Sequence, residues 1–344
     1  MEGAPASRTS ISLEQEDGLW VLELCEAMSG QRVRILPEIG ATLAEYSVGL
    51  GDAAVHVLDP PPDLRTVAKE PMRWGCPILF PFPNRIRNGG FEFEGSTYTF
   101  TESMLGGHHI HGLVYNRPWR LGTCEAGPAG AMARLELCSA DHPDLEEQYP
   151  FPFRISVAYI LTPFALSISV DIHNTGSAPM PVGFGLHPYF RLPLDLSGSR
   201  EACRVSVPAK ERWELEDCIP TGRVVPVSGS FDLREGQPLD GLKLDDVFTN
   251  LDRVGETPVQ CVLEDTEAGI QTVIELSPVF REVVVYTPPE RSSVCIEPYT
   301  CATDAPNLHA RGIDAGLRVL APGERLLVPI HIRVEDFEAT LSGL

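Results

Sequence analysis

Proton-transfer chemistry is the strongest possibility in this 344-residue chain, and two short segments could carry it. His187 lies between a glycine-rich stretch and Pro188, and Glu297 follows an apolar run and precedes Pro298. A carboxylate and an imidazole suit general acid and base catalysis, because their ordinary pKa values bracket the useful range at neutral pH. Each also has a structural alternative: a lone histidine is often a satisfied core residue, and a carboxylate at a strand end is often solvated.

Two further segments could bind a polar ligand. Asn84 and Arg85 lie in a stiff stretch flanked by prolines, where a guanidinium could present its planar fork of donors to a hydroxyl or a carboxylate. The alternative is a surface arginine beside a turn. Asp245 and Asp246 precede an apolar pair, and here the alternative is an ordinary turn.

A third polar segment holds three histidines within four residues, at His108, His109 and His111. In a strand, His109 and His111 would share a face, and a zinc ion could take a third ligand from elsewhere. No matching cysteine or carboxylate spacing follows, so the sequence predicts no metal and favours a polar pocket wall with solvated neighbours. The chain also lacks the P-loop, GxGxxG, HExxH and GxSxG motifs, which removes several common enzyme classes.

The elements that must position these residues are predicted to be strands. Apolar and polar residues alternate over 166–172 and similarly over 155–161, and the Thr-Pro pair between them predicts a hairpin. Alternation over 326–334 predicts another strand, in which Pro329 predicts an edge or bulged position. Only 143–148 is expected to form a short helix. Further strands are predicted at 20–24, 33–36, 97–101, 134–138, 204–207, 272–276 and 282–286.

The domain organisation follows from these signals. The 30 glycines and 31 prolines indicate many turns between short strands. There is no long helical stripe, internal repeat or low-complexity linker. We therefore expect an antiparallel all-β protein with one domain over residues 11–340, after a flexible tail at residues 1–10.

Charge and cysteine content limit the partners and the compartment. The formal net charge is −21, from 27 Lys and Arg against 48 Asp and Glu, which disfavours nucleic acid and anionic membranes but not a neutral sugar. We find no signal-peptide pattern and no apolar run long enough to span a membrane. Nine cysteines without a CxxC motif predict a reduced, cytoplasmic protein with free or buried thiols.

Taken together and in this order, these segments resemble the aldose 1-epimerase (mutarotase) family over nearly the whole chain. The family implies a large antiparallel β-sandwich, often called a supersandwich, with a sugar site on its concave face. The resemblance is carried by Pro37–Thr42, Asn84–Ile86, His111-Gly112, Trp119, Asp144, Tyr149-Pro150, His187–Phe190, Asp245, Phe248, Tyr286–Pro288, Glu297, Asp304–Asn307 and Pro322-Gly323.

The resemblance implies that Glu297 is the general base and His187 the general acid of a reaction that interconverts sugar anomers without a cofactor. Facing charges are expected to raise the pKa of His187 and keep it protonated at neutral pH. The predicted partner is a monosaccharide. By the same resemblance, its hydroxyls would be held by Arg85, His111 and Asp245, with Asn84 in support.

Two departures and three alternatives accompany this prediction. Galactose-specific members tend to carry Gln where this chain has Val284, and His where it has Asp246, so the match is closer to the broader branch of the family. A hexose-6-phosphate substrate would need cations such as Arg87, Arg117 or Arg120. A non-catalytic sugar binder or sensor on the same fold would bind without turnover, and a purely structural β-sandwich has no positive feature in the sequence.

Overall fold

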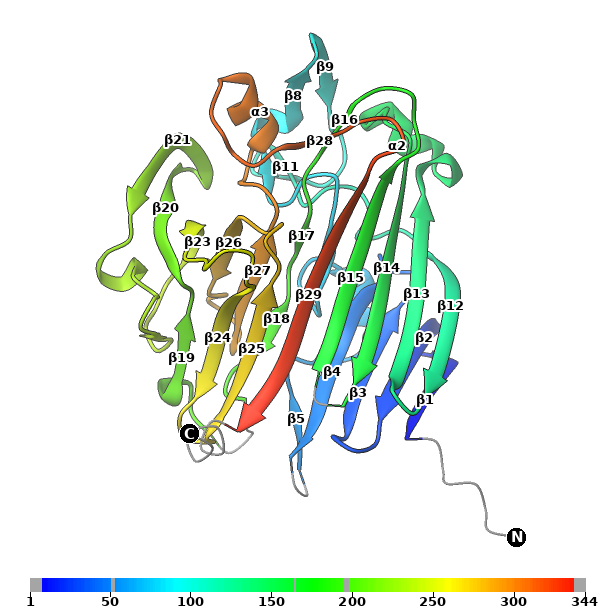
Figure 1. Cartoon of the computed structure of the whole chain (residues 1–344), viewed down its shortest axis with the longest axis vertical. Helices are drawn as coiled ribbons and strands as arrows, with labels where there is room; N and C mark the ends of the chain where they lie inside the picture. The colour runs from blue at the N-terminus through cyan, green and yellow to red at the C-terminus, as the bar shows by residue number, and fades with distance from the viewer. Residues whose placement is uncertain (1–7, 51–52, 164, 195–197, 337–344) are drawn as a thin grey trace.

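The computed structural model describes residues 8–50, 53–163, 165–194 and 198–336. Most of this chain is antiparallel β structure arranged in two facing layers, which lie one behind the other and in part overlap in Figure 1. The front layer is one nine-stranded sheet that runs across the whole molecule. In spatial order its strands are β12 (Arg120–Gly127), β13 (Gly130–Cys138), β14 (Phe153–Thr162), β15 (Ala165–Asn174), β29 (Arg325–Asp336), β25 (Ile270–Leu276), β24 (Val259–Asp265), β19 (Cys203–Ser206) and β22 (Gln237–Pro238).

The second layer consists of two sheets. The first is formed by β1 (Thr9–Glu16), β2 (Leu19–Glu26), β3 (Gln31–Leu36), β4 (Thr42–Leu50) and β5 (Ala53–His56). The second, which we call the site sheet, has eight strands. Its strands are β21 (Ile219–Pro226), β20 (Ala209–Glu216), β23 (Asp245–Leu251), β26 (Glu282–Tyr286), β27 (Ser293–Tyr299), β17 (Gly185–Leu186) and β6 (Ile78–Leu79), with β18 (Tyr189–Arg191) also paired to β27.

Short elements gather at one end of the layers, at the top of Figure 1. Small sheets are formed there by β7 (Arg85–Ile86), β11 (His108–Ile110) and β10 (Met104–Leu105), by β8 (Gly90–Phe93) and β9 (Ser96–Thr99), and by β16 (Met180–Val182) and β28 (Arg318–Leu320). The helices of the chain are short: α1 (Leu64–Lys69), α2 (Pro143–Gln148), α3 (Ala305–Ala310), η1 (Arg87–Gly89), η2 (Ser139–Asp141), η3 (Arg200–Ala202) and η4 (Gly229–Phe231).

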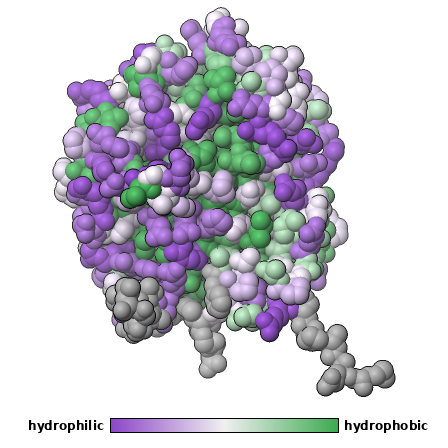
Figure 2. All heavy atoms as spheres, in the orientation of Figure 1, coloured by the Kyte–Doolittle hydropathy of each residue, from purple (hydrophilic) through white to green (hydrophobic). Residues whose placement is uncertain are grey.

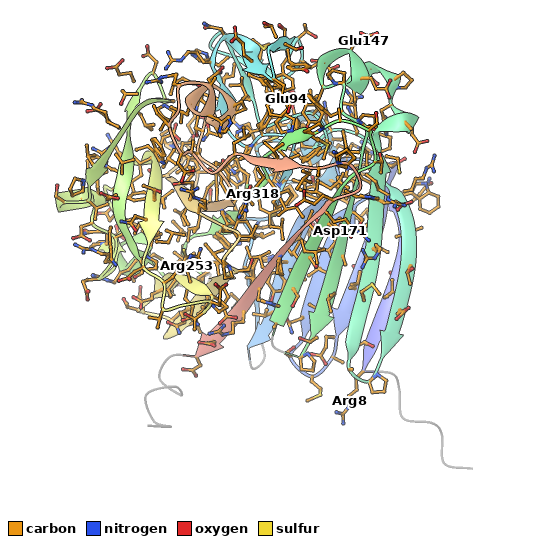
Figure 3. The ribbon with its side chains drawn as sticks, turned by 45° about the horizontal axis from the view of Figure 1, so that its top comes forward. Arg8, Glu94, Glu147, Asp171, Arg253 and Arg318 are labelled. Carbon is orange, nitrogen blue, oxygen red and sulfur yellow. The ribbon has the colours of Figure 1, made fainter. Side chains whose placement is uncertain are left out.

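The main core fills the space between the layers, where Figure 3 shows densely packed side chains. Strand β15 illustrates how the sequence builds it. Leu166, Ile168, Val170 and Ile172 are buried in the core, while the alternate residues face outward. Full burial of each such side chain stabilises the fold by roughly 1.5–3 kcal/mol before chain entropy is counted. On the outer face, Asp171 forms an ion pair with Arg325.

Strand β27 has one face in the main core and the other face against a second, smaller apolar cluster. Val294 and Ile296 point into the main core. Because side chains alternate along a strand, Cys295, Glu297 and Tyr299 lie on the opposite face of the site sheet. Tyr299 packs there in a separate apolar cluster with residues of β20, β23 and β26. The fold therefore presents a row of buried, chemically active side chains on the face that is turned away from the main core.

Most of the predicted elements are confirmed. The hairpin is β14–β15, the helix over 143–148 is α2, and further predicted strands lie within β2, β3, β13, β25 and β26. The strand predicted at 204–207 corresponds to β19, which ends one residue earlier, at Ser206. The strand predicted at 97–101 ends earlier, because β9 stops at Thr99. The tail predicted at residues 1–10 extends too far, because Thr9 and Ser10 belong to β1 and pair with β2. Residues 1–7 and 337–340 lie outside the described residues.

The prediction of an edge strand at Pro329 is wrong for β29 as a whole. This strand lies inside the nine-stranded sheet, between β15 and β25. The pairing with β25 ends at Ile330, whereas the pairing with β15 continues through Pro329 opposite Ser169. The missing N–H of Pro329 is tolerated because the residue has a neighbouring strand on one side only.

Polar and apolar residues both lie on the molecular surface. Figure 2 shows mostly hydrophilic residues on this face, with hydrophobic ones scattered among them. Leu327, on the outer side of β29, is 61% exposed, and a single exposed apolar residue of this kind is common on soluble surfaces. Among the described residues, no helix has the length and apolar character needed to cross a bilayer. All nine cysteines are free thiols.

Candidate active site

A pocket of about 600 Å³ opens on the face of the site sheet that is turned away from the main core. Such a volume is typical of small-molecule sites. Its walls combine residues of β18, β23, β26 and β27 with residues of β7, β10 and β11 and the loops beside them. All six residues predicted from the sequence line it together: Asn84, Arg85, His111, His187, Asp245 and Glu297.

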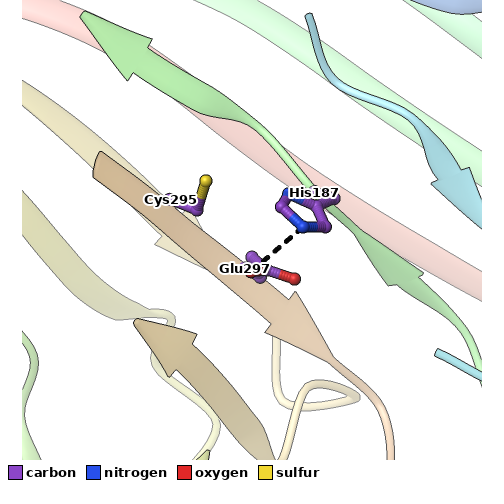
Figure 4. A group of neighbouring side chains, drawn as sticks. All are labelled: His187, Cys295 and Glu297. Carbon is purple, nitrogen blue, oxygen red and sulfur yellow. Dashed lines mark ion pairs between the residues drawn. The ribbon is translucent and has the colours of Figure 1, made fainter. Parts of the chain in front are cut away.

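Glu297 and His187 form the centre of the site, although they are far apart in the sequence. His187 Nε2 lies 3.4 Å from Glu297 Oε1, and both side chains are almost fully buried (Figure 4). The other carboxyl oxygen, Oε2, accepts a hydrogen bond from the hydroxyl of Tyr299. One oxygen of Glu297 is therefore anchored, and the other faces the imidazole at the pocket.

The imidazole of His187 is held by its neighbours. Its backbone N–H donates to the carbonyl of Pro77 over 3.1 Å. The ring stacks on Tyr189 with centroids 4.7 Å apart, and the edge of the His111 ring approaches it at 5.1 Å. The hydroxyl of Tyr189 in turn donates to the carbonyl of Met72, so the stacking partner is also fixed.

The protonation of this pair differs from the sequence-based expectation. Burial lowers the pKa of His187 to about 3, and the positive charge of Arg291 acts in the same direction. Burial raises the pKa of Glu297 well above its usual range, against a smaller opposing effect of the Tyr299 hydrogen bond. The predicted imidazolium is thus wrong for the ligand-free protein, because removing both groups from water disfavours the charged forms. These pKa shifts favour a neutral imidazole and a protonated carboxyl, with the proton of the pair on Glu297.

The segment with Asn84 and Arg85 is built into the pocket wall. Asn84 Oδ1 accepts hydrogen bonds from the backbone N–H of Arg85 at 2.9 Å and from its guanidinium at 3.2 Å. Asp304 fixes the same segment from behind, because its N–H donates to the carbonyl of Arg85 and its carboxylate accepts from the N–H of Arg87. The side chain of Arg85 is thereby directed along the pocket.

His111 is held against this segment by the backbone. Its N–H donates to the carbonyl of Asn84 over 2.9 Å. The next residue, Gly112, has a φ of +76°, and a Cβ there would lie 2.1 Å from the carbonyl oxygen of Phe80. Only glycine fits at this position, where the backbone of residue 112 passes close to that of Phe80. Burial is the main cause that lowers the pKa of His111 well below its usual range, so its ring is neutral.

The side chains of Asp245 and Asp246 have different partners, although the two residues are adjacent in the sequence. Asp245 lines the pocket at the start of β23, and the thiol of Cys218 approaches its carboxylate at 3.7 Å. Asp246 instead points to Arg212, with which it forms an ion pair of 3.2 Å. Val284, the other departure from galactose-specific members, is a buried residue opposite Glu297 on β26. Neither Asp246 nor Val284 belongs to the pocket wall.

The histidine segment forms no metal cluster of its own. His109 is buried, stacks on Phe100 and bonds through Nδ1 to the carbonyl of Glu102. His108 accepts a hydrogen bond from the N–H of Asn88. Of this segment only His111 reaches the pocket, together with the neighbouring Ile110. Among the described residues, the group with metal-ligand proximity consists of His187, Cys295 and Glu297 instead.

The cations considered for a phosphate group do not line the pocket. Arg117 is held between Glu102 and Asp144. Arg120 pairs with Asp141, and Arg87 lies close to Asp304. The pocket does contain two other arginines, Arg73 and Arg291. Arg291 is engaged by Asp59 and lies over the rings of Trp74 and Tyr189.

Sequence reasoning gave no role to four aromatic residues at the site. Tyr115, Tyr189 and Tyr286 line the pocket, and Tyr299 anchors Glu297 from outside it. Tyr299 had a usable signal, because strict alternation places residues 297 and 299 on one face of a strand. Tyr189 belongs to the motif segment His187–Phe190, but its stacking on His187 depends on how the chain turns after Pro188.

Comparisons with known proteins give one family. Residues 28–333 match the family model described as aldose 1-epimerase. In Escherichia coli K12, the uncharacterized protein YihR is 23% identical over 310 residues, covering 88% of this chain and 94% of that protein. The uncharacterized protein YphB of the same organism is 23% identical over 269 residues, covering 76% and 83%.

Solved structures show the same fold. A galactose mutarotase-like protein from Clostridium acetobutylicum superposes with a TM-score of 0.87 at 22% identity, covering 96% of this chain and 99% of that one. Galactose 1-epimerase from Lactobacillus acidophilus NCFM gives a TM-score of 0.75 at 18% identity, covering 96% and 99%. The chain is therefore an all-β sandwich of the galactose mutarotase-like type, as predicted.

Proposed function

The chain belongs to the aldose 1-epimerase family, and we propose that it interconverts the α and β anomers of a free aldohexose. The observation that carries this proposal is the approach of His187 Nε2 to Glu297 Oε1, which lie 3.4 Å apart inside a pocket and whose pKa shifts favour one proton on the pair. Opening a hemiacetal requires one group to accept the proton of the C1 hydroxyl while another donates a proton to the ring oxygen. A pair with one proton supplies both functions.

The geometry of the pair suits the atoms that react. The C1 hydroxyl oxygen and the ring oxygen are attached to the same carbon, so the acid and the base must lie close together. The 3.4 Å between His187 Nε2 and Glu297 Oε1 meets this requirement. One group takes the C1 hydroxyl proton, the C1–O5 bond breaks, and the other group protonates O5. Rotation about C1–C2 and the reverse transfers close the ring as the other anomer.

Either proton distribution supports the reaction. When Glu297 carries the proton, it is the acid and His187 the base. When the substrate draws the proton to His187, the roles are those expected from the family resemblance. The two arrangements contain the same number of protons, so they belong to one titration state of the coupled pair. Closure to the opposite anomer returns the pair to its starting protonation.

The remaining pocket residues would hold the sugar. The guanidinium of Arg85 offers fixed donors to hydroxyl oxygens, and the carboxylate of Asp245 offers acceptors to hydroxyl protons. Neutral His111 can donate or accept, and Asn84 orients Arg85. A neutral sugar matches this wall of mixed donors and acceptors. No group or electron is transferred, so the scheme uses no cofactor.

Polarimetry tests this function directly. Freshly dissolved α-D-glucose and α-D-galactose are followed with and without protein, after subtraction of the spontaneous rate. We expect faster approach to the same equilibrium rotation with at least one sugar. Binding of a sugar without acceleration would support the sensor alternative, and acceleration only with a 6-phosphorylated hexose would favour the phosphate alternative. Either result would overturn the proposal for free sugars.

A further inference from the structure

The catalytic pair has a third neighbour that the proposed reaction does not use, the thiol of Cys295. Cys295 lies two residues before Glu297 on the same face of β27 and is completely buried. The possible ligand atoms of His187, Cys295 and Glu297 all lie within 4.8 Å of one another (Figure 4). We propose that these three side chains bind a divalent transition-metal ion, best Zn²⁺, and that this ion inhibits the enzyme reversibly.

The spacing is close to that of a zinc site. Zinc binds imidazole nitrogen and carboxylate oxygen at about 2.0–2.2 Å and thiolate sulfur at about 2.3 Å, in tetrahedral geometry. These lengths place neighbouring ligand atoms roughly 3.3–3.7 Å apart. The 3.4 Å between His187 Nε2 and Glu297 Oε1 already falls in this range. The remaining distances are at most 4.8 Å, so the proposed site requires only small side-chain adjustments to reach bonding geometry.

Charge favours the ion once it arrives. The three groups lie in a buried environment where isolated charges are costly. A neutral imidazole, a thiolate and a carboxylate together carry two negative charges, which one divalent cation cancels. Binding releases one proton from the thiol of Cys295 and one from the carboxyl of Glu297, as is usual when a metal replaces protons on its ligands. The resulting complex has no net charge.

The pocket provides access and a fourth ligand position. His187 and Glu297 line the pocket, so an ion from solvent meets these two ligands first, and Cys295 lies beside them outside the pocket wall. The three protein ligands leave one tetrahedral position, which a water or a sugar hydroxyl can fill. The choice of ion follows from the donors, since imidazole and thiolate bind zinc much better than magnesium or calcium. A bound ion removes both the acid and the base from the reaction.

Cobalt is the probe that reports the thiolate directly. The protein is freed of metal with a chelator, transferred to metal-free buffer and titrated with Co²⁺. We expect one equivalent to produce a sulfur-to-cobalt charge-transfer band in the near ultraviolet, with visible bands of a four-coordinate site. The band is lost in Cys295→Ala and kept in Cys301→Ala. Cys301 is a matched control, because it is a buried free thiol near the end of the same strand.

Zinc inhibition gives the functional counterpart. Zn²⁺ is expected to suppress mutarotation and excess EDTA to restore it. In Cys295→Ala, the Zn²⁺ concentration for half-inhibition should rise at least tenfold, each variant being compared with its own metal-free rate. Circular dichroism verifies folding, and Cys295→Ser replaces the alanine variant if that one fails to fold. Absence of the charge-transfer band, or its persistence without Cys295, overturns the inference. The band does not depend on turnover, so failure of the proposed function would show separately as absent mutarotation.

Discussion

Two buried carboxyl groups lie on neighbouring strands of the site sheet, Glu297 on β27 and Glu282 on β26. Both are inaccessible to solvent or nearly so, and burial raises the pKa of both, to about 8 for Glu282. Each accepts a hydrogen bond from an aromatic side chain, Glu297 from Tyr299 and Glu282 from Trp213 Nε1 at 3.2 Å. Tyr299 also stands directly opposite Glu282 in the pairing of the two strands.

The difference between the two acids lies in what surrounds them. Glu297 lines the pocket and faces His187, whereas Glu282 is not part of the pocket wall. Beside it lie Trp213 and the apolar cluster that also contains Tyr299. Burial and a raised pKa are therefore shared by a candidate catalytic acid and a structural one. Access to substrate and a basic partner within proton-transfer distance separate them.

After replacement of Glu297, the largest loss of mutarotase activity is expected from replacement of its partner, His187. His187→Asn keeps a polar side chain of smaller size but cannot take up a proton. We expect kcat/KM for mutarotation to fall by roughly 10²–10⁴-fold, the usual contribution of a general acid or base. Initial rates by polarimetry measure it, with circular dichroism as the folding control. A variant with unchanged kcat/KM would remove His187 from the mechanism.

The next largest loss of activity is expected from replacement of Tyr299, whose hydroxyl donates a hydrogen bond to Glu297. Tyr299→Phe removes a hydrogen bond to an ionisable group, which is worth about 1.5–3 kcal/mol, and kcat should fall by roughly 10- to 100-fold. KM should change little, because Tyr299 does not line the pocket. The bond also lowers the pKa of Glu297, so its loss moves the alkaline fall in kcat/KM to higher pH. A purely structural tyrosine would leave the pH profile in place.

Glu282 should affect stability rather than catalysis. Its folded-state pKa of about 8 exceeds the ordinary 4.5. Between pH 4.5 and pH 8 the carboxyl therefore loses its proton readily only in the unfolded state, so the free energy of unfolding declines as pH rises through this range. Glu282→Gln cannot ionise and can still accept the bond from Trp213. Urea unfolding should show the variant more stable than the wild type at pH 8, by up to about a few kcal/mol, and less so at pH 5. Equal stability at both pH values would contradict this.

The smallest expected change is in the pH dependence of wild-type kcat/KM, which tests the protonation of His187 and Glu297. Since the pKa of His187 is lowered to about 3, its ring is neutral throughout the range from pH 5 to 7. We expect no inflection from His187 in kcat/KM over this range, and a fall as pH rises through the raised pKa of Glu297, when that residue loses the proton of the pair. An inflection near pH 6.5 would mean that His187 titrates like an exposed histidine.

The fold was largely predictable because alternation extends over long strands. The hairpin β14–β15 has ten residues on each side, so the two-residue period is unmistakable. The strands next to the site escape this reasoning, because β6, β7 and β17 have two residues each and no period can be recognised. The prediction at Pro329 was wrong because a proline excludes one backbone hydrogen bond but does not exclude a central strand. The pairing of β29 with β25 stops at Ile330 and does not include Pro329.

The site was predictable in its members but not in its electrostatics. The six pocket residues came from motif order through the family resemblance, since no periodicity predicts that His187 and Glu297 converge. The charge state of the pair depends on burial, which the sequence does not show, and it reversed the expected direction for the pKa of His187. The role of Tyr299 depends on a contact between alternate residues of β27, which alternation allows but does not require.

The central claim is that Glu297, and not its buried neighbour Glu282, carries the proton chemistry. Polarimetry on fresh α-D-glucose and α-D-galactose, with wild type, Glu297→Gln and Glu282→Gln at equal concentration, compares them in one assay. We predict a loss of roughly 10²–10⁴-fold in kcat/KM for Glu297→Gln and a change within about threefold for Glu282→Gln. Full activity in Glu297→Gln, or an equal loss in both variants, would contradict the account.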